Sequence, residues 1–115
     1  RFFTAATGLR HPEPDMEHCL LVVIVSPSME NAMVDWLLER EDVPGFTSVP
    51  VYGHGGSAKS MTAAEQVAGR QRRVMFQLHL AQDTAAVIIT ELNVEFGGSG
   101  IHYWQVPVLS SGHLY

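Results

Sequence analysis

The longest uninterrupted apolar run in the chain is Cys19–Val25, which contains seven residues and no polar side chain. A strand with one face in water alternates apolar and polar residues, so this run predicts a strand that is dry on both faces. Residues 74–80 show the other pattern, because Val, Phe, Leu and Leu occupy the even positions and Met, Gln and His the odd ones. That alternation predicts a strand with a single apolar face.

Two longer segments carry apolar residues at helical spacing. Ser26 and Pro27 are typical of a helix start, since serine can accept a bond from a free amide and proline tolerates the first turn. The second segment begins at Gln82 or Asp83 and ends before Gly97. A short helix is predicted between Thr62, where a capping box begins, and Gly69. The longer helices are expected over residues 27–42 and 82–96, and the strands over residues 18–25, 46–52, 73–80 and 101–109.

This order of elements predicts an α+β, ferredoxin-like βαββαβ fold with a helical insert in the hairpin between the second and third strands. Right-handed crossovers place the four strands in the antiparallel order 4-1-3-2. Pro50 and Pro107 fall in the strands that this order places at the edges, where proline is tolerated. Residues 16–115 are expected to form one domain, and residues 1–15 a disordered or tag-like extension.

The two long helices can cover only one face of such a sheet. The dry strand at Cys19–Val25 therefore needs a cover on its other face, and a second copy of the same chain is the simplest one. The sequence thus predicts self-association.

Composition limits the remaining function classes. The 115 residues include 46% apolar and 17% charged ones, and the net charge of −5 argues against a dedicated nucleic-acid binder. The single cysteine, Cys19, excludes an internal disulfide and is expected to be an inert core thiol. No apolar stretch reaches membrane-spanning length, so we expect a cytoplasmic protein without membrane insertion.

Basic residues are concentrated in the predicted hairpin. Lys59, Arg70, Arg72 and Arg73 are four of the seven basic residues and lie within fifteen positions. In an acidic chain this cluster could bind a phosphate, a carboxylate or an acidic partner, or it could be solvated charge at a hairpin edge.

Two glycine-rich loops are further candidates for ligand binding. The loop Gly53-His54-Gly55-Gly56 could place backbone amides around a phosphate. It lacks the Gly-Lys-Ser/Thr ending of a P-loop, and a flexible turn is the alternative. The second loop, Gly98-Ser99-Gly100, precedes the last predicted strand.

The six histidines show no chelating spacing such as H-x-x-H. His102, beside the second glycine loop, is the best candidate for a metal ligand, with His54 as the second. No Ser/His or Cys/His pattern of a nucleophile is present, so we expect neither an enzyme nor a bound cofactor.

With these elements in place, the chain resembles the PII-like superfamily from about Glu17 to Leu114. Three segments resemble those of an uncharacterised subgroup whose members tend to be encoded beside heavy-metal efflux systems. The superfamily features are Gly53-His54-Gly55, the long hairpin insert, Gly98-Ser99-Gly100 and Val106-Pro107-Val108, and the subgroup segments are Val34–Leu38, Ala64–Gln71 and His102–Trp104.

The resemblance implies a ligand-sensing homotrimer that acts on a partner, such as a transporter or an efflux-system protein. The insert between His54 and Arg73 would be its moving or docking element. Nucleotide-binding members carry Arg-Gln-Lys where this chain has Gly56-Ser57-Ala58, a lysine where it has Ile101, and an arginine-rich tail where it has Ser110–Tyr115. We therefore expect poor ATP binding.

Two alternatives stay open at this point. One is a copper- or zinc-binding tolerance protein, which the histidines suggest. The other is a small ferredoxin-like dimeric enzyme, which would need a polar, enclosed pocket between helices and sheet.

Overall fold

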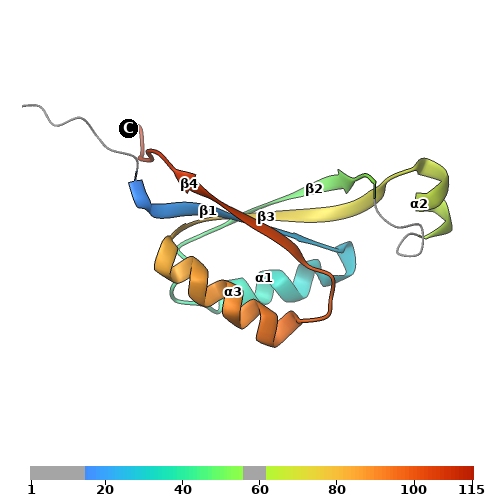
Figure 1. Ribbon diagram of the computed structural model, residues 1–115, viewed down its shortest axis with the longest axis horizontal. Coiled ribbons are helices and arrows are strands. Elements are labelled where there is room, and N and C mark those ends of the chain that lie inside the picture. The colour runs from blue at the N-terminus through green and yellow to red at the C-terminus, as the bar shows by residue number, and fades with distance from the viewer. Residues whose placement is uncertain (1–14, 56–61) are drawn as a thin grey trace, which may run out of the picture.

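The computed structural model describes residues 15–55 and 62–115. Its four strands form one sheet, and its long helices lie together on one side of that sheet (Figure 1). The strands are β1 (Asp15–Val25), β2 (Thr47–Gly53), β3 (Gln71–Ala81) and β4 (His102–Val108). The helices are the short 3₁₀ helix η1 (Pro27–Met29), α1 (Glu30–Leu38), α2 (Ala63–Ala68) and α3 (Gln82–Phe96).

The strands are antiparallel and lie in the order β2-β3-β1-β4, which confirms the predicted order 4-1-3-2 and the ferredoxin-like fold. The apolar strand β1 is central and pairs with β3 on one side and β4 on the other. Pro50 and Pro107 lie on β2 and β4, the two edge strands, where proline interrupts no central ladder.

The main core lies between the sheet and helices α1 and α3. The predicted alternation of β3 is confirmed, because the even positions from 74 to 80 are buried while Met75 and Gln77 are half-buried and His79 is exposed. From β1, the odd-numbered residues Cys19 to Val25 enter the same core. The helices add Met33, Leu37, Ala85, Ile88 and Leu92.

No described helix covers the opposite side of the sheet (Figure 1). We call this side the open face. Val22, at its centre, is only 3% exposed because Gln77 of β3 and Trp104 of β4 flank it, whereas Leu20 and Ile24 are half-buried. β1 was predicted to be buried on both faces. On the open face of a single chain, Val22 is buried as predicted, whereas Leu20 and Ile24 are only half-buried. The open face includes Leu20, Val22, Ile24, Thr47, Val49, Val51, Met75, Gln77, His79, His102, Trp104 and Val106.

The first helix differs from its prediction over residues 27–42. Ser26 is the N-cap of η1 and Pro27 its first residue, as predicted, but the Ser26 side chain makes no cap hydrogen bond; its Oγ instead lies 3.0 Å from the Oγ of Ser28. The helix ends at Leu38, after which the backbone N–H of Arg40 donates to the Leu37 carbonyl at 3.2 Å and turns the chain. The Arg40 guanidinium then bonds the Asp42 carboxylate at 2.9 Å.

The predicted boundaries of the strands shift by a few residues. β1 begins at Asp15 rather than His18, because Asp15 pairs with Val108 across an irregularity in the ladder. The other residues of the predicted N-terminal extension, 1–14, lie outside the described residues.

In the part of the chain that the structure describes, every helix is too short or too polar to cross a membrane.

Candidate functional site

Three of the predicted basic residues line one cavity of about 580 Å³, which we call the arginine pocket. Arg70 reaches it from just before β3, and Arg72 and Arg73 reach it from the start of that strand. The start of η1, the end of β2 and the first turn of α2, each helix with its N-cap, supply the rest of its wall. Those residues are Ser26, Pro27, Ser28, Tyr52, Thr62, Ala64 and Glu65.

The β2-β3 register positions the first two arginines. Tyr52 pairs with Arg72 across the hairpin, and the guanidinium of Arg70 lies over the Tyr52 ring at 4.1 Å from its centroid. A cation in this position is attracted by the face of the ring, which restrains an otherwise long and mobile side chain. The Arg73 guanidinium is held differently, because it donates to the Arg72 carbonyl at 2.8 Å and to Oε1 of Gln71.

Glu65 connects α2 to β3 beside these arginines. The predicted capping box is present: Oε1 of Glu65 accepts the Thr62 N–H at 3.0 Å, and the Thr62 hydroxyl accepts the Glu65 N–H at 3.1 Å. Oε2 of Glu65 accepts the backbone N–H of Arg72 at 3.2 Å. These two backbone donors, that of Thr62 first, hold the pKa of Glu65 below its ordinary value. Gly69, with φ of 71°, ends the helix in the left-handed conformation and leads to Arg70.

The pocket is positive in an acidic protein. Its lining carries three guanidinium groups and one carboxylate. Within residues 15–55 and 62–115, no carboxylate lies in ion-pair contact with these three arginines, whereas Arg40 pairs with both Asp42 and Glu91. The pocket arginines therefore keep donors available for an external anion.

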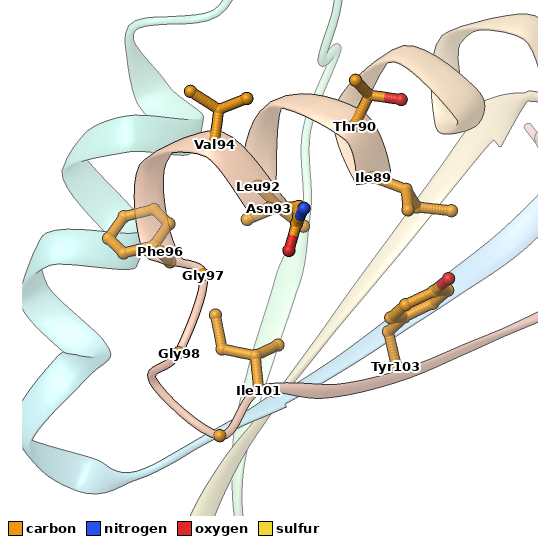
Figure 2. Close-up of a pocket in the computed structure, with 11 residues that line it drawn as sticks. Ile89, Thr90, Leu92, Asn93, Val94, Phe96, Gly97, Gly98, Ile101 and Tyr103 are labelled. Atoms are coloured by element: carbon orange, nitrogen blue, oxygen red, sulfur yellow. The ribbon is translucent and has the colours of Figure 1, made fainter.

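The second glycine loop borders a different cavity, of about 480 Å³, between α3 and β4 (Figure 2). Gly98 and Gly100 line it together with apolar side chains such as Ile89 and Ile101, and no charged residue is among its lining residues. Ser99 is not part of this lining; its N–H donates to the Phe96 carbonyl at 3.1 Å. The loop therefore shows the geometry of a helix-ending turn and lacks cations for a phosphate.

The first glycine loop follows β2 directly. Gly53 is the last residue of β2 and pairs with Gln71, while His54 and Gly55 are exposed and Gly55 has φ of 82°. None of the three lines the arginine pocket. The other predicted members of this region, Gly56 and Lys59, lie outside the described residues.

The histidines do not form a metal centre within the described ranges. No three or more of His, Cys, Asp and Glu come together there in a way that could hold a metal ion. His102 is exposed on β4 with its ring centroid 5.4 Å from that of Trp104, and His54 is exposed after β2. Sequence reasoning did not find the pair His18 and His79, whose ring centroids lie 5.2 Å apart.

Sequence reasoning also did not place Tyr52, Ser26 and Ser28 in the arginine pocket. Tyr52 joins it through the strand register, and the two serines join it because β1 ends beside β3. The local signals in this region were the basic cluster, which marked the arginines, and the capping box at Thr62, which indicated a helix; neither pointed to Tyr52 or the serines.

Comparisons with known proteins agree with this architecture. A family model described as a protein of unknown function (DUF3240) matches residues 16–115. The structure of a DUF3240 family protein from Shewanella baltica is similar, with a TM-score of 0.70 and 22% identity over 86% of this chain and 98% of that one. A protein from Thermus thermophilus, assigned provisionally to the PII-like signalling proteins, has a TM-score of 0.57 and 17% identity, covering 79% of this chain and 86% of that one. The search of curated proteins returned no match.

Proposed function

Because this chain belongs to the DUF3240 family and shares the fold of a PII-like protein, we propose that it is a non-enzymatic regulatory protein. It acts as a homotrimer in the cytoplasm and transmits a signal to a partner protein through the β2-β3 hairpin. The observation that carries this proposal is the PII-like arrangement of the sheet, together with a cluster of arginines at the base of the hairpin insert. From the family resemblance, the partner is a transporter or an efflux-system protein.

The open face supports the assembly. On this face Trp104 and Val106 of β4 remain 42% and 41% exposed in the single chain, beside the half-buried Leu20 and Ile24 of β1. Exposed apolar side chains on a sheet face that no described helix covers are typical of an interface rather than of a solvated sheet face. A closed ring of identical chains buries this face without leaving an open edge.

The position of the hairpin supports its role as the responding element. Figure 1 shows that β2 and β3 extend beyond the body formed by the sheet, α1 and α3, and that α2 lies at the far end of this extension. A short helix far from the main core is held by fewer contacts, so its order is the first to change when a ligand or partner binds. The arginine pocket lies beside that helix.

Light scattering coupled to gel filtration tests the assembly. We expect the wild-type protein at micromolar concentration to have three times the chain mass of 12.7 kDa. Val106→Lys places a charge on the open face and should dissociate the trimer. The matched variant Val94→Lys, at an 81% exposed position of α3, should leave the mass unchanged. A wild-type monomer or dimer, or equal behaviour of the two variants, would contradict the proposed trimer.

A further inference from the structure

We propose that the arginine pocket binds a small anionic metabolite, whose phosphate or carboxylate group is held by the guanidinium groups of Arg70 and Arg72. Only the role of this ligand as a signal rests on the proposed regulatory function. The binding itself depends on the pocket alone.

Arg70 is positioned for such an anion before any ligand arrives. Its guanidinium carbon lies over the Tyr52 ring at 4.1 Å from the centroid, and within the described ranges no ion pair occupies its N–H groups. Those N–H groups form the fork that matches two oxygens of a carboxylate or phosphate. Restraint of the side chain by Tyr52 lowers the entropy that is lost on binding.

Arg72 brings a second guanidinium to the same cavity. It pairs with Tyr52 across the hairpin, so the two arginines approach the same tyrosine, Arg72 along the strand register and Arg70 from above the ring. The backbone N–H of Arg72 donates to Glu65. The Arg72 side chain remains exposed and makes no ion pair in the described part of the chain.

The carboxylate of Glu65 does not neutralise this pair. Each of its oxygens accepts a backbone N–H, from Thr62 and from Arg72, and neither oxygen bonds a guanidinium of the pocket. An incoming anion therefore has no internal ion pair to displace. Arg40 is the contrasting case, since Asp42 and Glu91 already occupy its donors.

The size and lining of the cavity indicate more than an inorganic ion. Its volume of about 580 Å³ lies within the range of about 300–1,000 Å³ found for small-molecule sites. The hydroxyls of Ser26, Ser28 and Thr62 line the remainder and can bond a polar, uncharged body. The class of ligand is therefore a small metabolite with an anionic end and hydroxyl or carbonyl groups.

Ligand binding in the arginine pocket would restrain the β2-β3 hairpin insert through Glu65. Glu65 links the cap of α2 to the backbone of Arg72, so an anion held by the Arg72 side chain also restrains α2. The expected response is slower amide exchange in residues 62–73 when the ligand is bound.

Calorimetric titration of the full chain tests the site, with pyrophosphate as the phosphate probe and malonate as the carboxylate probe. We expect at least one probe to bind at low ionic strength, more weakly at about 0.15 M salt. Arg70→Ala and Arg72→Ala should each weaken binding on the order of tenfold, because each removes charged hydrogen bonds. Arg40→Ala removes the same charge elsewhere and should leave the affinity unchanged. Arg70→Lys should recover only part of the loss, since lysine lacks the fork.

Several outcomes overturn the assignment. One is that neither probe binds at millimolar concentration, and another is that Arg40→Ala weakens probe binding as much as Arg70→Ala and Arg72→Ala do. A third is that a polyglutamate peptide binds and neither probe does, which would assign the pocket to an acidic protein partner. Circular dichroism melts check that each variant is folded. The mass measured by light scattering separates the two proposals: a trimer that binds neither probe refutes this site alone, whereas a monomer that binds them refutes the trimer alone.

Discussion

Phe76 offers the sharpest test of how the sheet divides the molecule into two faces. Its side chain is fully buried and belongs to the core beneath α1 and α3. It pairs with Val23 of β1 and Ser48 of β2, and its ring centroid lies 5.9 Å from that of Phe46. We predict that Phe76→Ala removes a large part of the stability of the fold.

The magnitude follows from the loss of a whole ring in a closed site. Burial of the Phe76 ring stabilises the wild-type fold by about 2 kcal/mol of apolar transfer free energy, and the alanine variant lacks this contribution. A residual cavity on the order of 80–100 Å³, at about 24 cal/mol per Å³, costs about 2 kcal/mol more. The free energy of unfolding should fall by about 4 kcal/mol, which is a large part of the roughly 5–15 kcal/mol typical of a domain.

The neighbouring residue Met75 supplies the matched control. It lies on the same strand but points to the open face, where it is only half-buried in the single chain. Met75→Ala should therefore cost about 1–2 kcal/mol, and this cost should grow with protein concentration if assembly buries the face. Urea denaturation followed by circular dichroism measures both. Equal losses for Phe76→Ala and Met75→Ala at low protein concentration would refute the division into a closed and an open face.

Three further predictions concern single contacts. Gly97→Ala should lower the free energy of unfolding by about 1–3 kcal/mol, because the added Cβ would lie 2.4 Å from the carbonyl oxygen of Asn93; an unchanged urea midpoint would contradict this. The hydrogen bond from Arg40 holds the pKa of Asp42 below its ordinary value of 3.8, so this pair stabilises the fold at neutral pH and ceases to do so as the pH falls through the lowered value. Asp42→Asn should thus cost at most about 1 kcal/mol at pH 7 and nothing near pH 2, and a loss that persists in acid would argue against the pair. Burial raises the pKa of the Cys19 thiol, so it should react with a disulfide reagent far more slowly in the native protein than in urea, and equal rates would show that the thiol is accessible.

Part of the arginine pocket was visible in the chain itself. Arg70, Arg72 and Arg73 are close in sequence, so any fold keeps them near one another, and their local excess of charge marked them as candidates. The role of Tyr52 was not visible, because it depends on which residue of β2 lies opposite Arg72. Ser26 takes the predicted N-cap position of η1 without a side-chain cap bond, and its place in the lining of the pocket was not visible in the sequence.

The amino-acid sequence by itself determined the elements of this protein and their order. The alternation at residues 74–80 and the apolar run of β1 are local patterns, and a local pattern fixes which face of an element avoids water. Pro50 and Pro107 then excluded their strands from the centre of the sheet. Tertiary structure alone decided the strand register, the position of Arg70 over the Tyr52 ring and the cavity between η1, β2, α2 and the start of β3. These features depend on distances between segments far apart in the chain, which packing and hydrogen-bond pairing set and which no short sequence pattern encodes.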